Sequence, residues 1–240
     1  MTHRALVTGG AGGIGSAIVL ELARAGHEVV FTHMGQAEEA AALVAKAAEE
    51  GFKVVAEESD TTDAHSVDAI HQKWEPLTLV HCAGIARDRM IWKQNPLDFD
   101  AVMNVNLRGA WLQIRASAAA MREYGWGRVV LIGSINGTRG KMGQSAYAAS
   151  KAALHGLARS TARELGRSGV TVNVVEPGWV DTPMTMAVPP EFRDAATEET
   201  ITGNLCKPRD VAAAVGFLVS DGGRQITGQV LRVDGGQCLS

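Results

Sequence analysis

A serine, a tyrosine and a lysine in one stretch of the chain have the types and spacing of a proton-transfer site. The apolar run Val129–Gly133 predicts a buried strand that ends directly before Ser134. A glycine-rich turn, Gly137 to Gly143, precedes an expected helix that carries Tyr147 and Lys151. Residues four apart on a helix share one face, so Tyr147 and Lys151 are expected to point the same way.

This spacing predicts acid–base chemistry. An ammonium beside a phenol favours the phenolate, so we expect Lys151 to lower the pKa of Tyr147. An isolated tyrosine, with a pKa of about 10, is a poor proton donor near neutral pH, and a lowered pKa would make it a better one. The pair alone is weak evidence, but behind a strand that ends in Ser134 it indicates a catalytic site.

A glycine loop near the N-terminus predicts a dinucleotide site. The strand Ala5–Thr8, the loop Gly9–Gly15, the helix Ser16–Ala25 and the strand His27–Thr32 form an expected βαβ unit. Glycines let the backbone approach a pyrophosphate, and the helix N-terminus offers free N–H groups. The spacing is ambiguous, because two glycine patterns fit: Gly10, Gly12 and Gly15, or Gly9, Gly13 and Gly15.

The rest of the chain continues to alternate between strands and helices. Helices are expected at 36–50, 63–74 and 210–220, a long or broken helical segment at 95–121, and strands at 52–57, 77–82, 170–175 and 229–233. This alternation predicts an α/β fold, a Rossmann-type doubly wound parallel sheet with helices on both faces. No linker, repeat or low-complexity tract interrupts it, so one domain over 1–240 is expected, with a proline-interrupted substrate lid at about 183–205.

Composition excludes several classes of protein. The 240 residues are 46% hydrophobic and 20% charged, and a net charge of −3 gives no basic footprint for nucleic acid. Cys82, Cys206 and Cys238 are too scattered for a disulfide framework or a metal site, and no metal is expected. The sequence has no signal peptide and no apolar run long enough to span a bilayer, so a soluble cytoplasmic protein is expected.

Two sets of polar residues leave alternatives open. Asn106 lies in the expected helix, where it is either a helix-bending structural residue or a functional one. Arg87, Arg89 and Lys93 follow the fourth strand, where they form either a solvated helix start or a phosphate-binding group.

Nearly the whole chain resembles the short-chain dehydrogenase/reductase family. The resemblance rests on motifs in the family's order and spacing: Thr8-Gly9-x-x-x-Gly13-x-Gly15, Asp60, Ala83-Gly84, Asn106, Ser134, Tyr147-x-x-x-Lys151, Pro177-Gly178 and Thr182. It favours the glycine pattern Gly9, Gly13 and Gly15. One departure is Cys82, which stands where the family usually has asparagine, and a nucleophilic pair with His81 is discounted because adjacent strand residues face opposite ways.

The resemblance implies a role for each catalytic residue. Ser134 would hydrogen-bond a substrate carbonyl, and Tyr147 would give that oxygen its proton. Lys151 would lower the pKa of Tyr147 and bind the nicotinamide ribose. Asn106 would hold a water that links Lys151 to solvent.

The resemblance also implies a nicotinamide cofactor. The residues expected to hold it are Gly9, Gly13, Ile14, Gly15, Thr32, His33, Asp60, Thr61, Ala83, Gly84, Tyr147, Lys151, Pro177, Gly178, Val180 and Thr182. NAD-preferring members tend to end the second strand with an acidic residue, whereas this chain has Thr32 and His33 there and no carboxylate until Glu38. NADP is therefore favoured over NAD, although no arginine or lysine lies in the glycine loop or just after the second strand.

Within the family, the chain is most similar to 3-oxoacyl-(acyl-carrier-protein) reductase-like members. The similar stretches are Gly133–Gly137, Asn173–Gly178 and Gly235-Gly236, which imply an NADPH-dependent ketoreductase of carrier-bound or coenzyme A thioesters. Carrier-protein users usually show a basic patch near the serine-bearing strand, but this chain has one cation there, Arg128. A free small or polyketide-like ketone as the substrate, an NAD-linked secondary-alcohol dehydrogenase and a catalytically silent dinucleotide sensor remain alternatives. Relatives commonly form homotetramers through the helices at 95–121 and 145–167, so a homotetramer is expected.

Overall fold

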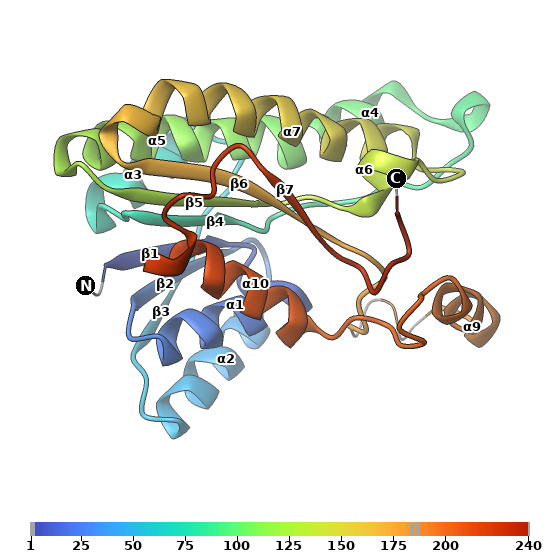
Figure 1. The fold of residues 1–240 in the computed structure, drawn as a ribbon, viewed down its shortest axis with the longest axis horizontal. Coiled ribbons are helices and arrows are strands. Elements are labelled where there is room, and N and C mark those ends of the chain that lie inside the picture. Colours follow the sequence, from blue (N-terminus) through green and yellow to red (C-terminus); the bar gives the residue numbers. More distant parts are fainter. Residues whose placement is uncertain (1–2, 183–184, 186–187, 240) are drawn as a thin grey trace.

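The carboxyl ends of parallel strands create the edge on which the predicted residues meet. The computed structural model describes residues 3–182, 185 and 188–239. In these residues seven strands form one parallel sheet, in the order β3-β2-β1-β4-β5-β6-β7 (Figure 1). The strands are β1 Arg4–Thr8, β2 Glu28–His33, β3 Val54–Glu58, β4 Thr78–His81, β5 Gly127–Ile132, β6 Val170–Pro177 and β7 Val230–Val233. The strand order reverses between β1 and β4, so ligands are expected in the crevice at the carboxyl ends of these strands.

Helices cover both faces of the sheet, as the alternation predicted (Figure 1). One face carries α1 (Gly13–Arg24), α2 (Ala37–Glu49) and α10 (Pro208–Val219), and the other carries α3 (Ala64–Trp74), α5 (Gly109–Tyr124) and α7 (Ser145–Leu165). Successive strand residues point to opposite faces, so in β5 Val130 belongs to the first hydrophobic core and Leu131 to the second. Burial on both faces explains why these strands are continuous apolar runs.

The helical segment expected at 95–121 is continuous, but its helical pitch changes partway along. Asn95 caps α4 (Pro96–Met103) by accepting the Leu97 N–H at 2.9 Å. A π-helical turn, Asn104–Arg108, then leads into α5. Such turns are rare and often mark functional sites, and this one contains the fully buried Asn106.

Two short helices were not expected from the sequence. Residues 137–139, predicted as part of a glycine-rich turn, belong instead to α6 (Ile135–Arg139), because Ser134 caps that helix by accepting the Asn136 N–H at 3.2 Å. Inside the expected lid lies α9 (Pro190–Glu198), beyond the carboxyl edge of the sheet (Figure 1). Of that lid, residues 183, 184, 186 and 187 lie outside the described residues. No helix in the described part of the chain has the length and apolar character needed to cross a membrane.

Candidate active site

The fold brings Ser134, Tyr147 and Lys151 together at the carboxyl end of β5. Ser134 is the second residue after the strand, is 8% exposed, and its hydroxyl hydrogen-bonds Tyr147 from α7. Lys151 lies one helical turn further, with Nζ 5.7 Å from the centroid of the Tyr147 ring. The same Nζ donates a hydrogen bond of 2.8 Å to the carbonyl of Ile132, which anchors α7 to the end of β5.

Burial, more than charge pairing, shifts the pKa values of Tyr147 and Lys151. Loss of hydration raises the pKa of Tyr147, and the hydrogen bond with Ser134 only partly opposes this. The net shift of the Tyr147 pKa is therefore upward, opposite to the lowered pKa that the sequence predicted. Burial also lowers the pKa of Lys151 to about 8. At neutral pH the phenol keeps its proton, while the lysine is still mostly charged.

Asn106 clamps the loop that follows β4. Its Nδ2 donates to the Ile85 carbonyl at 3.0 Å and to Ser150 Oγ at 2.9 Å, and its Oδ1 accepts the Ile85 N–H at 2.8 Å. Both amide hydrogens are thus used, which supports a structural role for the side chain. Its role as a holder of a relay water stays a prediction. Ser150 in turn donates to the Tyr147 carbonyl, so this serine is engaged away from the reacting group.

The Ala83-Gly84 turn passes directly beside these side chains. A Cβ on Gly84 would lie 3.2 Å from Lys151 Nζ and 3.3 Å from Asn106 Oδ1. Glycine therefore leaves the room that a ligand would need next to Lys151.

The glycine loop packs β1 against β4 and opens α1. Gly9 has a φ of +64°, and a Cβ there would lie 2.8 Å from the Ala83 Cα. A Cβ on Gly15 would lie 2.2 Å from the Gly9 carbonyl oxygen, so both positions require glycine. Helix α1 begins at Gly13, beside Ile14, and no side chain caps its first turn. An uncapped helix start with a close-packed glycine loop fits a pyrophosphate group.

The end of β2 supplies a polar group that no described residue satisfies. Thr32 is 3% exposed, and its carbonyl accepts the Gly10 N–H at 2.9 Å. His33 is also buried, and its Nδ1 has no hydrogen-bond partner among the described residues. A buried, unpartnered ring nitrogen at this edge fits contact with a polar ligand.

Sequence reasoning missed Glu58, which lies beside this position. Glu58 ends β3 opposite His33 in the strand register, and its carboxylate accepts the Gly35 N–H at 3.3 Å. Because Glu58 is 25 residues away from His33 in the sequence, only the pairing of β2 with β3 reveals the contact.

The two residues expected after β3 differ in their surroundings. Asp60 is part-buried and accepts the Thr62 N–H and hydroxyl through Oδ1, both at 2.8 Å. Thr61 packs against α5, where its hydroxyl accepts Gln113 Nε2 at 3.4 Å. The Thr61 side chain thus makes a contact within the protein, to Gln113.

Beyond β6, the loop with the remaining predicted residues packs against the C-terminal segment. Pro177 ends β6, and Gly178, Val180 and Thr182 follow it. A Cβ on Gly178 would lie 2.4 Å from Gln237 Oε1, so the backbone of this loop approaches the C-terminal segment as closely as glycine permits.

His81 and Cys82 do not form a nucleophilic pair. Burial lowers the pKa of His81 to about 3 and raises the pKa of the Cys82 thiol to about 11. At neutral pH neither an imidazolium nor a thiolate is present, which agrees with the expectation from strand geometry.

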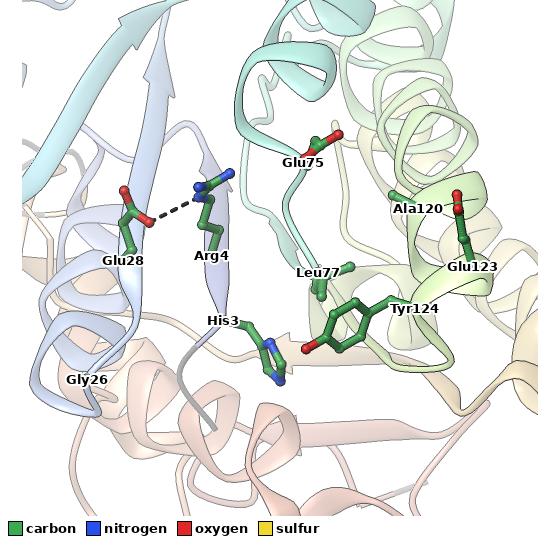
Figure 2. A pocket seen from close by; sticks show the side chains of 9 residues that line it. All are labelled: His3, Arg4, Gly26, Glu28, Glu75, Leu77, Ala120, Glu123 and Tyr124. Carbon is green, nitrogen blue, oxygen red and sulfur yellow. Dashed lines mark hydrogen bonds and ion pairs between the residues drawn. The ribbon is translucent and has the colours of Figure 1, made fainter.

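A pocket of about 660 Å³ lies at the opposite edge of the sheet (Figure 2). His3, Arg4, Leu77 and Tyr124 are among its lining residues. Arg4 starts β1 and Leu77 directly precedes β4, so this pocket lies at the amino ends of the strands, away from Ser134. It is not the candidate active site.

Comparison with known proteins gives consistent matches over almost the full length. A family model described as enoyl-(acyl carrier protein) reductase matches residues 9–237. The chain is 39% identical to the 3-oxoacyl-(acyl-carrier-protein) reductase of Pseudomonas aeruginosa, over 98% of this chain and 97% of that protein. It is 38% identical to the acetoacetyl-CoA reductase of Allochromatium vinosum, over 98% of both chains. A solved short-chain dehydrogenase/reductase from Serratia marcescens superposes with a TM-score of 0.92 at 34% identity, covering 98% of this chain and 97% of that one.

Proposed function

This chain belongs to the short-chain dehydrogenase/reductase family, and we propose that it reduces the 3-oxo group of an acyl thioester with NADPH. The observation that carries the proposal is the meeting of Ser134, Tyr147 and Lys151 at the carboxyl end of β5. The thioester part is supported by the names of the relatives from Pseudomonas aeruginosa and Allochromatium vinosum.

The proposed chemistry follows from the protonation of these side chains. Ser134 Oγ accepts the Asn136 N–H at 3.2 Å, and its single hydrogen, which hydrogen-bonds Tyr147 in this structure, turns to the substrate oxygen when substrate binds. Tyr147 keeps its proton near neutral pH and gives it to the same oxygen as negative charge develops there. The Lys151 ammonium then stabilises the tyrosinate by charge attraction. The nicotinamide, when bound, supplies the hydride.

A carbonyl oxygen fits this site better than a carbon–carbon double bond. The matching family model is described as an enoyl reductase, whereas the curated relatives are named as reductases of 3-oxoacyl and acetoacetyl thioesters. The Ser134 and Tyr147 hydroxyl groups hydrogen-bond one another, so both lie close enough to donate to one substrate oxygen. That oxygen becomes an alkoxide only in carbonyl reduction. We therefore place a 3-oxoacyl substrate ahead of an enoyl substrate.

The choice of NADPH rests on the end of β2. The residues at the end of β2, Thr32 and His33, have no carboxylate. His33 Nδ1, which has no partner among the described residues, is available to bind a 2′-phosphate. Glu58 acts in the opposite sense, because a carboxylate near a phosphate repels it. We expect kcat/KM for NADPH to exceed that for NADH by about tenfold or more. A preference for NADH would overturn this choice and point to Glu58.

Docking of a carrier protein through Arg128 is not supported. Arg128 is 4% exposed, donates to the carbonyls of Gly127 and Gly169, and lies over the Trp126 ring at 4.5 Å. A buried guanidinium with these partners cannot meet an acidic carrier surface. This favours a coenzyme A thioester over a carrier-bound one, and it keeps a free ketone as the second candidate.

The test is nucleotide oxidation followed by absorbance against a matched panel. The panel contains acetoacetyl-CoA, acetoacetyl carrier protein, crotonyl-CoA and simple cyclic or aromatic ketones, each with NADPH and with NADH. Rapid turnover of acetoacetyl-CoA with NADPH is the expected result. Turnover of crotonyl-CoA alone would favour an enoyl reductase, and turnover of free ketones alone would favour the second candidate. Nucleotide binding without any turnover would indicate a silent sensor.

A further inference from the structure

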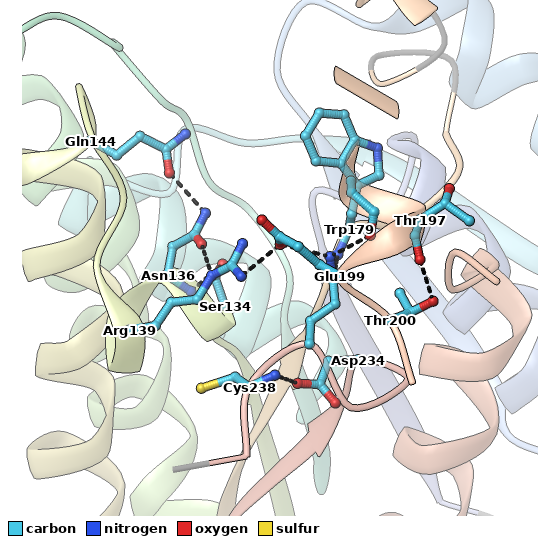
Figure 3. A network of polar contacts seen from close by, with 12 residues as sticks. Ser134, Asn136, Arg139, Gln144, Trp179, Thr197, Glu199, Thr200, Asp234 and Cys238 are labelled. Carbon is cyan, nitrogen blue, oxygen red and sulfur yellow. Dashed lines mark hydrogen bonds and ion pairs between the residues drawn. The ribbon is translucent and has the colours of Figure 1, made fainter. Parts of the chain in front are cut away.

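A chain of polar side chains joins segments that surround Ser134 (Figure 3). Each member hydrogen-bonds the next, and together they form what we name the polar chain: Asp88, Gln144, Asn136, Arg139, Glu199 and Gln237. These residues come from the loop after β4, the loop before α7, α6, the end of α9 and the C-terminal segment. The polar chain thus connects the segment that carries Ser134 to the expected lid.

Arg139 is the member that joins the two sides. Its Nε donates to Asn136 Oδ1 at 3.1 Å, and its Nη1 donates to Glu199 Oε2 at 2.8 Å. The Arg139 side chain is 27% exposed, whereas the Glu199 side chain is 50% exposed. A planar guanidinium can satisfy both acceptors at fixed angles, which a lysine ammonium cannot reproduce.

On the active-site side, Asn136 carries the contact to Ser134. Its backbone N–H donates to Ser134 Oγ at 3.2 Å, and its Nδ2 donates to Gln144 Oε1 at 2.9 Å. Gln144 then donates to Asp88 Oδ2 at 2.7 Å. The Asn136 side chain is thus held between Arg139 and Gln144, which fixes the backbone donor that orients the serine hydroxyl.

On the lid side, Glu199 and Gln237 hold the end of α9. Gln237 Nε2 donates to Glu199 Oε2 at 3.3 Å and to the Ala196 carbonyl at 3.0 Å, while its Oε1 accepts the Trp179 N–H at 2.7 Å. The last turn of α9 is therefore tied both to α6 and to the loop after β6.

We propose that Arg139 is a positioning residue, which orients Ser134 through Asn136 and holds α9 over the site through Glu199. Its effect on turnover rests on the carbonyl reduction proposed above, whereas its effect on α9 does not. The two contacts of Arg139, which we name the Glu199 arm and the Asn136 arm, predict different kinetic effects. The Glu199 arm encloses the substrate, so its loss raises KM. The Asn136 arm orients Ser134, so its loss lowers kcat.

Three variants separate the two arms. Glu199→Gln should raise KM about fivefold, the scale of a partly exposed ion pair, with kcat nearly unchanged. Arg139→Gln should raise KM similarly and also lower kcat about tenfold, because Ser134 loses its orientation. Arg139→Lys should keep KM near that of the unchanged protein but lower kcat. The lysine ammonium can still pair with Glu199, but it cannot at the same time donate to Asn136 as the guanidinium does.

Hydrogen exchange of the α9 amides gives a measurement that needs no substrate. Exchange should become faster in Arg139→Gln and Glu199→Gln, and the double variant Arg139→Glu/Glu199→Arg should restore slow exchange and KM but not kcat. The matched control is Arg24→Gln, which removes a comparable ion pair with Glu50 on the face that carries α1 and α2 and should leave exchange, KM and kcat unchanged.

The outcomes distinguish this proposal from the proposed function. Unchanged α9 exchange in both single variants would overturn the hold on α9, whichever substrate the protein uses. Faster exchange with unchanged kcat in Arg139→Gln would overturn the orientation of Ser134. If no ketone or thioester is turned over but α9 exchange responds as expected, the proposed reaction fails while the contact to α9 stands.

Discussion

At the scale of single residues, hydration decides which groups carry protons. Tyr147 and Lys151 were expected to form a pair in which the cation lowers the pKa of the phenol. In the structure both side chains lose water, so the neutral form of each gains: the pKa of Tyr147 rises and that of Lys151 falls to about 8. The phenol therefore holds a proton for the reducing direction, but its raised pKa makes it a weaker acid, so proton transfer depends on the charge of Lys151.

Replacement of Tyr147 by phenylalanine removes the proposed acid. We expect Tyr147→Phe to lower kcat by about 10²-fold or more, because no other described hydroxyl replaces the phenol proton. Nucleotide binding, measured by fluorescence titration, should stay within about twofold, since the ring and its packing are kept. Full activity in this variant would contradict the assignment, and Ser145→Ala, at an exposed serine bonded to Gln94, is the matched control.

The lowered pKa of Lys151 predicts the alkaline limb of the pH profile. Below about pH 8 the side chain is an ammonium that stabilises the tyrosinate, and above that pH it loses its charge. The rate constant kcat/KM for ketone reduction should therefore fall as pH rises through about 8. The Tyr147 phenol does not explain such a fall, because its own pKa is raised. A profile that stays flat to about pH 10, the ordinary range of lysine and tyrosine, would contradict this assignment.

At the scale of elements, buried polar side chains fix how strands and helices meet. Asn106 holds the loop after β4 to the π-helical turn, and His81 joins β4 to β1 through Thr8, with 3.0 Å between His81 Nδ1 and Thr8 Oγ1. The Thr8 hydroxyl also accepts the N–H groups of Cys82 and Ala83, so its single hydrogen points to His81. His81 must therefore be neutral at Nδ1 for this junction to form.

His81 predicts a loss of stability in acid. Its pKa in the folded protein, about 3, lies below the ordinary value of 6.5, so the folded state disfavours protonation. The stability it contributes is full above pH 6.5 and is lost as pH falls from 6.5 towards 3. Between pH 7.5 and 5.0 this linkage costs about 2 kcal/mol. In urea unfolding, the decrease should be smaller in His81→Asn than in the unchanged protein by about this amount, since His71, whose pKa burial also lowers, contributes equally to both. An equal decrease in both proteins would contradict the prediction.

At the scale of the whole molecule, exposed apolar side chains bear on assembly. Leu97 and Phe99 on α4 and Trp111 on α5 are 74%, 43% and 49% exposed. Large apolar groups are costly to leave in water, and contiguous ones often mark contacts between proteins. These helices belong to the segment through which a homotetramer was expected from the family resemblance, and that assembly stays a prediction.

Light scattering tests the assembly directly. We expect a mass close to four chains for the unchanged protein, and a smaller species for Trp111→Lys, because a lysine buried in an interface without a partner is strongly unfavourable. Lys53→Ala, a change at the loop before β3, should leave the mass unchanged. A monomer for the unchanged protein would contradict the expectation.

The sequence by itself determined the alternation of strands and helices, the glycine loop and the places of Ser134, Tyr147 and Lys151. These features are local: hydrophobic periodicity and glycine spacing are read within one element, and parallel strands bring their carboxyl ends to one edge. The family resemblance added the expected roles. Two short helices, α6 and α9, escaped prediction because capping and packing define them more than periodicity does.

Only the tertiary structure decided what depends on burial and on contacts between distant residues. The direction of the Tyr147 pKa shift follows from lost hydration, which no spacing reveals. Glu58 reaches the end of β2 through strand pairing, and Arg139 meets Glu199 across 60 residues of chain. Such contacts form only when separate elements pack, since the chemistry of each residue alone does not specify its neighbour.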